Sequence, residues 1–334
     1  MVIEQDYSSF HVLLTGGTGF FGRALLRNWI SQAQSGEKIA RVCVLSRNPQ
    51  IFLKKYPEFS GHPWLHFHQG DILNPYTLPR DEFSHVLHAA TDSTVGPQLT
   101  PLERYIQIVD GTRNMLEYAV EKNIKRFLLT SSGGVYGPQP QEMASIREDY
   151  NGMPDPLEAE NAYSVAKRCA EHLCSLYRVN FGLHTVVARC FSFVGRDLPL
   201  DAHFAIGNFI HDALNRNEIL VKGDGSAVRT YLDQRDLAIW LCALLYKGAD
   251  GEAYNVGSDI PITMLELANL VREILAPTVV INCACQATIS NSSVHYVPNI
   301  YKALTNLNLE IKYPLLQAIY DVALGWSELK DQVR

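Results

Sequence analysis

The stretch Thr15-Gly16-Gly17-Thr18-Gly19-Phe20-Phe21-Gly22 decides the fold of this 334-residue chain. It directly follows a short apolar run, His11–Thr15, and opens a helical pattern over Arg23–Gln32. Glycines permit a tight turn and a close approach of the backbone to a pyrophosphate, while the helix N-terminus offers unpaired N–H groups and a partial positive charge. Strand, turn and helix together predict a dinucleotide-binding site.

Short apolar runs alternate with longer helical patterns through the first half of the chain. The runs predict strands at His11–Thr15, Val42–Ser46, Leu65–Gln69, His85–His88, Phe127–Ser131 and Thr185–Arg189. Helices are predicted at Arg23–Gln32, Leu102–Lys122 and Ala162–Phe181. This alternation indicates a parallel sheet covered on both faces, so the predicted fold class is α/β, a Rossmann-type doubly wound parallel sheet with a smaller C-terminal lobe. Ligands of such sheets bind at the carboxyl ends of the strands.

The pattern changes beyond about residue 195. Shorter elements follow, with a helix near Phe204–Asn215, a strand near Arg229–Leu232 and a helix near Asp236–Tyr246, and Thr263 with Glu266 forms a capping box that starts another helix. We expect a dinucleotide-binding domain over residues 1–195 and a smaller substrate-binding lobe over 196–334, with some exchange of chain between them. No linker separates the two, which predicts one unit with a cleft.

Composition excludes several classes of protein. Hydrophobic residues make up 47% of the chain and charged residues 19%, which is typical of a globular enzyme. The formal net charge of −6 argues against binding of nucleic acid. Seven scattered cysteines predict reduced thiols and a cytoplasmic location, and no metal site is expected. Neither a signal peptide nor a membrane span is expected.

Cofactor choice depends on the end of the second predicted strand, where an acidic residue often accepts hydrogen bonds from the ribose of NAD. This chain has Ser46 and Arg47 there. An arginine pairs with the extra phosphate of NADP, whereas a carboxylate would repel it, so the sequence favours NADP over NAD. The alternative is a solvated arginine on a surface loop, which leaves the cofactor open.

Residues after the third and fourth strands add to the cofactor site. Asp71-Ile72 follows one, and Asp71 can accept a hydrogen bond from the adenine amino group. Ala89-Ala90-Thr91 follows the other, where small residues let a dinucleotide lie against the backbone.

Two Tyr-x-x-x-Lys pairs occur in the chain. Tyr118 and Lys122 lie on the helix before the fifth strand, where they are interpreted as packing and solvated residues. Tyr163 and Lys167 begin the helix that follows the turn after Ser132, and their spacing places both side chains on one helical face. A lysine ammonium beside a phenol is expected to lower its pKa, so that Tyr163 acts as general acid or base, with Ser132 bonded to the same substrate oxygen.

The chain resembles the NAD(P)-dependent nucleotide-sugar epimerase/dehydratase family of extended short-chain dehydrogenases/reductases. Its matching motifs are residues 15–22, 131–137, 163–167, 189–195, 223–229 and 255–258. The resemblance implies catalytic Ser132, Tyr163 and Lys167, a contact of Lys167 with the nicotinamide ribose, and a homodimer formed through a four-helix bundle. The expected cofactor contacts are Gly16, Thr18, Gly19, Phe20, Phe21, Gly22, Ser46, Arg47, Asp71, Ile72, Ala89, Ala90, Thr91, Tyr163 and Lys167.

The resemblance also suggests substrate contacts. It makes Arg229 a clamp on a nucleotide diphosphate and Asn208 a further phosphate-side contact, and a guanidinium fork suits a diphosphate. Ser132 and Ser192 are expected to contact the sugar, although Ser192 and Ile108 both replace an asparagine usual in the family. Tyr296 begins a segment similar to one near the family's nucleotide pocket.

Two glycines limit the set of reactions that the chain is expected to catalyse. Family dehydratases carry an Asp-Glu pair at the positions of Gly133 and Gly134, and glycine transfers no proton. We therefore expect hydride transfer at C4 of a nucleoside-diphosphate sugar, as an epimerase or a 4-keto-sugar reductase. The alternatives are a reductase of a small non-nucleotide carbonyl compound, a dehydratase lacking the usual acidic pair, and a non-catalytic dinucleotide sensor.

Overall fold

The computed structural model describes residues 9–91, 99–200, 202, 204–285 and 294–333. Its centre is a seven-stranded sheet with the order β11-β6-β5-β4-β1-β2-β3, in which every neighbouring pair is parallel. The strands are β1 (His11–Thr15), β2 (Arg41–Ser46), β3 (Leu65–Gln69), β4 (His85–His88), β5 (Arg126–Ser132), β6 (His184–Cys190) and β11 (Ala253–Val256). The predicted fold class is confirmed, and β1 to β6 lie where the sequence placed them.

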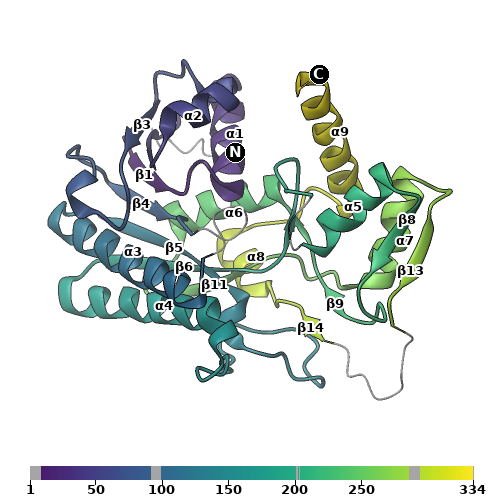
Figure 1. Ribbon diagram of the computed structural model, residues 1–334. Helices are drawn as coiled ribbons and strands as arrows, with labels where there is room; N and C mark the ends of the chain where they lie inside the picture. The colour runs from purple at the N-terminus through teal and green to yellow at the C-terminus, as the bar shows by residue number, and fades with distance from the viewer. Residues whose placement is uncertain (1–8, 92–98, 201, 203, 286–293, 334) are drawn as a thin grey trace.

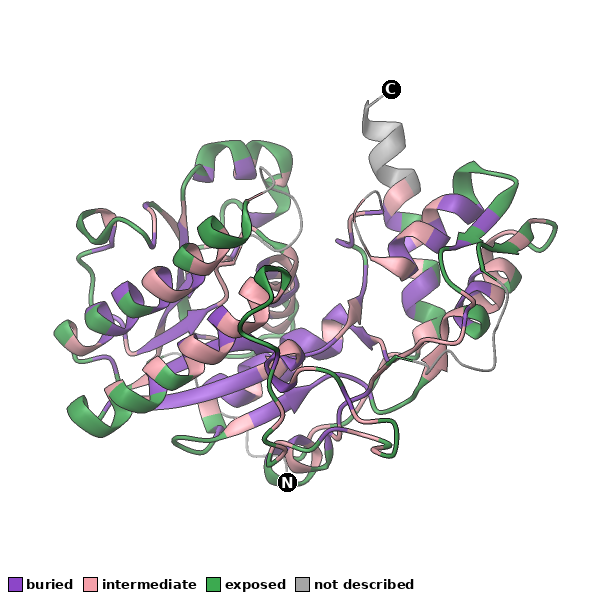
Figure 2. Cartoon of the chain, turned by 60° about the horizontal axis from the view of Figure 1, so that its bottom comes forward, coloured by how far each residue is buried: buried purple, intermediate pink, exposed green. Residues whose placement is uncertain are grey.

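Two layers of helices cover the sheet (Figure 1). Helices α3 (Pro101–Glu121) and α4 (Ala162–Phe181) cover one face, and α1 (Phe20–Gln34) and α6 (Gln234–Lys247) cover the other. Within β1, Val12 and Leu14 pack on the α1 side while Leu13 packs on the α3 side, because successive side chains point to opposite faces. Figure 2 shows the resulting buried strands between helices whose outer faces are exposed.

The smaller lobe has its own core. It is built from α5 (Ala205–Asn215), α7 (Met264–Leu275) and α9 (Leu315–Val333), with the parallel pair β8 (Glu218–Val221) and β13 (Val280–Cys283). Ile219, Val271 and Ile319 are fully buried at its centre. The predicted capping box is confirmed, since the Thr263 side chain accepts from the Glu266 N–H and the Glu266 carboxylate accepts from the Thr263 N–H.

The strand predicted over Arg229–Leu232 is wrong. The chain forms β9 (Val228–Arg229), which lies between β12 (Ile262–Thr263) and β14 (His295–Tyr296), and then β10 (Leu232–Asp233), which pairs with β7 (Phe193–Val194). The two residues between β9 and β10 carry the chain from one small sheet to another, and Thr230 is completely buried there. The stretch predicted as one strand therefore contributes to two different sheets.

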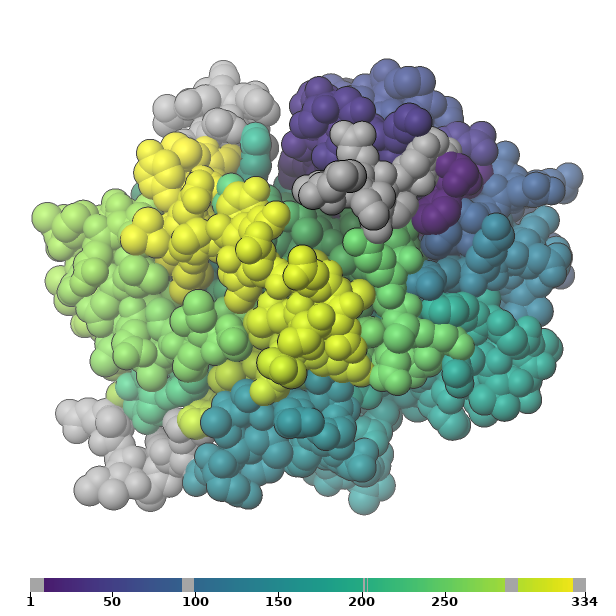
Figure 3. All heavy atoms as spheres, turned by 180° about the vertical axis from the view of Figure 1, so that it is seen from behind, coloured from purple at the N-terminus to yellow at the C-terminus, as the bar shows by residue number. Residues whose placement is uncertain are grey.

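The chain crosses between the lobes more than once. Helix α6 and strand β11 come from the second half of the sequence but belong to the large sheet. Helix α8 (Tyr301–Leu307) then packs against α6 and β11, and Figure 3 shows this C-terminal part of the chain lying between the two lobes. The domain boundary at residue 195 stays a prediction.

Three further observations complete the fold. Helix α2 (Pro49–Lys55) connects β2 to β3. Among the described helices, none combines the length and the apolar character needed to cross a membrane. All seven cysteines are free thiols.

Candidate active site

A cavity of about 1690 Å³ lies at the carboxyl ends of the central strands and extends to the smaller lobe. This is the position at which ligands of doubly wound sheets bind. The predicted residues that line it are Gly16, Thr18, Gly19, Phe20, Phe21, Ser46, Arg47, Asp71, Ile72, Ala89, Ala90, Thr91, Ser132, Tyr163, Lys167, Ser192 and Arg229. The structure therefore brings most of the predicted site together.

Two predicted contacts do not line the cavity. Gly22 is buried within α1, where an added Cβ would overlap the backbone of Gly17, so its role is close packing of the helix on the turn. Asn208 lies on α5 outside the lining. The prediction that it contacts phosphate finds no support in this geometry.

The glycine-rich turn forms a cradle for a dinucleotide. Gly16 has a φ of +72°, and a Cβ there would collide with the carbonyl group of Ala89. Gly19 is the N-cap of α1, and its N–H donates to the Gly16 carbonyl at 3.0 Å. The start of α1 faces the cavity, and its backbone N–H groups suit a phosphate. These residues fit the pyrophosphate of a nicotinamide dinucleotide, which when bound supplies hydride transfer.

Lys167 is anchored deep in the cavity wall. Its Nζ donates to Thr91 Oγ1 at 2.9 Å and to the Thr130 carbonyl at 2.8 Å. The same atom lies 5.9 Å from the centre of the Tyr163 ring. Burial lowers the pKa of Lys167 to about 8.

The predicted lowering of the Tyr163 pKa is wrong for the ligand-free protein. Burial raises the pKa of Tyr163 to about 12, and hydrogen bonding to Ser132 only partly opposes this. The ammonium of Lys167 is held by Thr91 and Thr130, so desolvation of the phenol dominates. Tyr163 therefore carries its proton at neutral pH in the ligand-free protein.

The second Tyr-x-x-x-Lys pair is structural, as the sequence analysis interpreted it. Tyr118 is buried, and its hydroxyl donates to the Pro79 carbonyl at 2.8 Å. Lys122 is the C-cap residue of α3.

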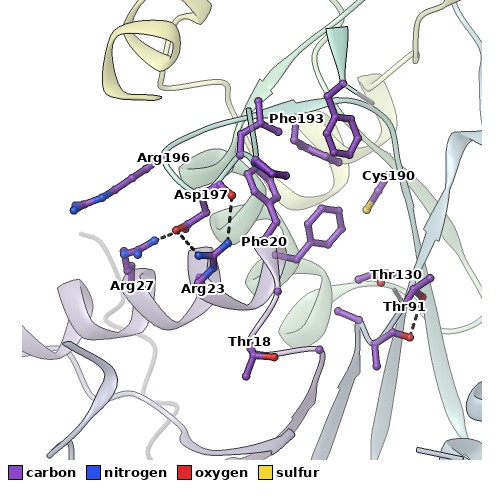
Figure 4. Close-up of a pocket in the computed structure, with 18 of the residues that line it drawn as sticks. Thr18, Phe20, Arg23, Arg27, Thr91, Thr130, Cys190, Phe193, Arg196 and Asp197 are labelled. Atoms are coloured by element: carbon purple, nitrogen blue, oxygen red, sulfur yellow. Dashed lines mark hydrogen bonds and ion pairs between the residues drawn. The ribbon is translucent and has the colours of Figure 1, made fainter. Parts of the chain in front are cut away.

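The cavity wall also contains residues that no sequence motif predicted. Arg23 and Arg27 of α1 both pair with Asp197 (Figure 4). Asp197 also accepts a hydrogen bond from Gln234 at 2.7 Å. This network links α1 to the connection between β7 and α5, and so fixes one side of the cavity. Arg104 and Gln107, one turn apart on α3, also line it. No motif marked these residues, because their roles depend on contacts far apart in the sequence.

The cradle, the anchored lysine and the serine beside a phenol define a nicotinamide-dependent enzyme of Rossmann fold. The model of the NAD dependent epimerase/dehydratase family matches residues 12–257, and the chain belongs to this family. It is therefore an enzyme of an NAD-binding family that acts on nucleotide sugars.

Individual relatives agree with this assignment. The chain is 30% identical to UDP-glucuronic acid decarboxylase 1 of Arabidopsis thaliana over 92% of its length and 68% of that protein. It is 29% identical to the low-salt glycan biosynthesis protein Agl12 of Haloferax volcanii over 78% of its length and 81% of that protein. Among solved structures, dTDP-glucose 4,6-dehydratase from Streptomyces venezuelae, with NAD bound, has a TM-score of 0.81 at 21% identity and 96% and 98% coverage. UDP-glucuronic acid 4-epimerase from Bacillus cereus has a TM-score of 0.78 at 22% identity and 96% and 99% coverage.

The buried histidine His88, on β4, should make the protein sensitive to acid. Its ring is buried between the hydroxyls of Thr15, at 2.7 Å, and Thr112, at 3.3 Å. Burial lowers its pKa from 6.5 to about 3, so the unfolded chain binds the extra proton first as the pH falls below 6.5. We expect this residue to remove about 2 kcal/mol of stability between pH 7 and pH 5.

Urea unfolding at both pH values measures this loss. His88→Gln should flatten the pH dependence, whereas the same change at the exposed His66 should leave it as in the wild type. Equal pH dependence in wild type and His88→Gln would contradict the assignment.

Proposed function

We propose that the chain transfers hydride between C4 of a nucleoside-diphosphate hexose and a nicotinamide dinucleotide. The observation that carries this proposal is that Ser132, Tyr163 and Lys167 line the same cavity as the glycine cradle. In this role Tyr163 exchanges a proton with the sugar oxygen at C4, and Ser132 orients that oxygen. Lys167 supplies a fixed positive charge to the same end of the cavity.

Arg229 supports a nucleotide diphosphate as the recognition element. It lines the cavity at the smaller lobe, with its guanidinium held by the carbonyls of Val228 and Val294 at 2.9 and 3.0 Å. These bonds fix its position while leaving further donors of the fork for phosphate oxygens. Ser192 lies in the same cavity.

The fate of the C4 ketone decides the reaction. Return of the hydride to the opposite face of a ketone formed from the bound sugar gives epimerisation. A reductase instead takes up a 4-keto sugar as its substrate, and NADPH from solution transfers hydride to C4 and leaves as NADP+. If the sugar carries a carboxylate on C5, the ketone is a β-keto acid, and loss of CO₂ is a third outcome. The decarboxylases among the relatives favour including it.

The test is direct incubation. Purified protein is mixed with UDP-glucose, UDP-glucuronic acid, dTDP-glucose or a nucleoside-diphosphate 4-keto sugar, with and without NADPH, and products are identified by mass and sugar NMR. Mass-neutral conversion supports an epimerase, consumption of NADPH supports a reductase, and a loss of 44 Da, the mass of CO₂, supports a decarboxylase. No product from any sugar nucleotide would contradict the proposal.

We further propose that NADP(H) is preferred over NAD(H). Ser46 and Arg47 both line the cavity at the end of β2, and no carboxylate occupies either position. We expect Arg47→Ala to weaken NADPH binding roughly tenfold, the value of one charge-assisted hydrogen bond, and to leave NADH binding unchanged. Calorimetry with both cofactors measures this, and Arg41→Ala at the opposite end of β2 is the matched control. An equal effect on the two cofactors would overturn the preference.

The family resemblance also supports a homodimer through α3 and α4. Their outer faces expose the large apolar side chains of Leu102, Ile106, Leu176 and Val179. Pairing of these faces between two copies would form a four-helix bundle and remove this surface from water.

A further inference from the structure

Arg104 lines the cavity with a charged group that has no partner in the described part of the chain. It lies near the start of α3 and is partly buried. Its guanidinium forms no ion pair with any described residue, and its Nε is buried without a hydrogen bond. A cation that is partly removed from water and left unpaired costs free energy, and an anionic ligand would offset that cost.

Arg104 and Tyr163 occupy similar places on two neighbouring helices. Because β4, β5 and β6 are parallel, the helices that connect them, α3 and α4, both begin at the carboxyl edge of the sheet. The two helices pack side by side (Figure 1), and the Tyr105 hydroxyl lies 3.5 Å from Cys169 Sγ. Arg104 and Tyr163 both lie within the first four residues of their helices and line the cavity. The guanidinium is therefore at the same end of the cavity as the phenol.

The carboxylates of the cavity lie elsewhere or are already paired. Among the described lining residues they are Glu58, Asp71 and Asp197. Glu58 and Asp197 form ion pairs with arginines of α1. Asp71 follows β3, which is four strand positions from β5, or roughly 19 Å at the usual strand spacing. At the start of α3 and α4 the described lining therefore supplies the cations Arg104 and Lys167 and no carboxylate.

Resting on the function proposed above, we propose that Arg104 is a specificity-determining residue that selects a nucleoside-diphosphate sugar with a carboxylate on C5, which is a uronic acid. A guanidinium fork pairs with a carboxylate through two parallel hydrogen bonds. In this arrangement Arg229 of the smaller lobe holds the diphosphate and Arg104 of the large lobe holds the sugar carboxylate. The two charged groups of the substrate then meet cations on separate walls of the cavity.

The covalent structure of a hexuronic acid fits the position of Arg104. In the proposed function Tyr163 exchanges a proton with the oxygen on C4, and C5, which bears the carboxylate, is bonded directly to C4. The carboxylate therefore lies beside the oxygen that Tyr163 contacts, at the end of the cavity where α3 and α4 begin. A neutral hexose has a primary alcohol at the same place, which can accept a hydrogen bond but leaves the charge of Arg104 uncompensated.

Matched pairs of sugar nucleotides test this proposal by calorimetry. UDP-glucuronic acid is compared with UDP-glucose, and GDP-mannuronic acid with GDP-mannose, so that the members of each pair differ only at C6. Reduced cofactor is present to prevent oxidation of the sugar. We expect the wild type to bind the uronic acid of at least one pair about tenfold more tightly or better, the value of one charge-assisted hydrogen bond. The absence of such a preference in both pairs would overturn the proposal.

Two substitutions at position 104 separate charge from shape. Arg104→Met removes the charge and keeps much of the length, and it should weaken binding of the uronic acid at least about tenfold while the neutral sugar stays within twofold of wild type. Arg104→Lys keeps the charge but lacks the fork, so its affinity for the uronic acid should be intermediate. Equal losses for the acidic and the neutral sugar in Arg104→Met would contradict recognition of the carboxylate.

Arg113→Met is the matched control. Arg113 lies on the same helix, but it is exposed, lies outside the cavity lining and pairs with Asp110 at 3.7 Å. Its sugar affinities should equal those of the wild type. Thermal unfolding shows whether each variant is folded, and Arg104→Met should unfold at the wild-type temperature, because the side chain has no partner to lose.

Titration with the reduced cofactor separates the sugar from the other anion that the cavity is expected to hold. The Kd for the dinucleotide should stay within twofold of wild type in Arg104→Met. A large rise in that Kd would assign Arg104 to a phosphate of the dinucleotide and would overturn the proposal.

The binding test does not depend on turnover. If the wild type converts no nucleotide sugar, the proposed function fails, while the affinity ratio still decides whether Arg104 recognises a carboxylate. If neutral sugar nucleotides are converted and no uronic acid is preferred, the proposed hydride transfer stands and the role of Arg104 is overturned.

Discussion

Replacing Tyr163 with phenylalanine is expected to lower kcat by about 10²–10⁴-fold, the usual contribution of a positioned general acid or base. The substitution removes one hydroxyl and retains the ring on α4, so the glycine cradle and the cavity walls keep their shape. Because the binding groups are intact, the Kd for the dinucleotide should change by less than twofold. Steady-state rates with the active sugar nucleotide and calorimetry with the cofactor measure the two effects.

Tyr118→Phe provides the control for Tyr163→Phe. Tyr118 occupies the first position of the other Tyr-x-x-x-Lys pair, but its hydroxyl bonds a backbone carbonyl far from the cavity. The Tyr118→Phe variant should lose some stability and no more than a small part of its kcat. A similar loss of kcat in both variants would indicate general destabilisation and would contradict a catalytic role for Tyr163.

Gly16→Ala is expected to weaken dinucleotide binding at least about 100-fold, since at least two hydrogen bonds from backbone N–H groups to charged phosphates are displaced. The new Cβ would collide with the carbonyl of Ala89, so the turn must move away from β4. Fluorescence titration with the reduced cofactor measures the affinity.

Gly36→Ala separates collision from backbone strain. Gly36 also has a positive φ, of +83°, but nothing lies within 4 Å of its Cβ position. The Gly36→Ala variant should lose about 1 kcal/mol of stability and retain its affinity for the dinucleotide. Equal losses of affinity at the two positions would show that strain, and not the contact with Ala89, determines binding.

The large sheet was predictable because its strands are buried on both faces. The predicted strand Val42–Ser46, for example, is apolar from residue 42 to residue 45 and ends at a polar residue where the chain turns into a loop. The same logic located Ser132 and Thr91 at strand ends, and the structure places both in the cavity. In the smaller lobe the elements are shorter and their partners distant, so a local pattern could not show that Val228–Arg229 and Leu232–Asp233 pair in different sheets.

The electrostatic environment of the site residues was harder to predict than their positions. The spacing of Tyr163 and Lys167 correctly placed both on one face of α4, but spacing does not show which acceptors a lysine finds. The contacts of Lys167 with Thr91 and Thr130 and the desolvation of Tyr163 arise from β4 and β5. Tyr296 was marked only by the similarity of its segment, and its place opposite Arg229 depends on the pairing of β14 with β9.

Because the chain returns to the large sheet in its second half, the protein cannot be cut at the boundary between the lobes and still form a complete large sheet. A fragment ending near residue 195 would lack β11 and would expose the hydrogen-bonding edge of β6. It would also lose α6, whose Trp240, Leu241 and Leu244 are completely buried. Such a fragment would be poorly folded and prone to aggregation. The intact enzyme should unfold in a single thermal transition.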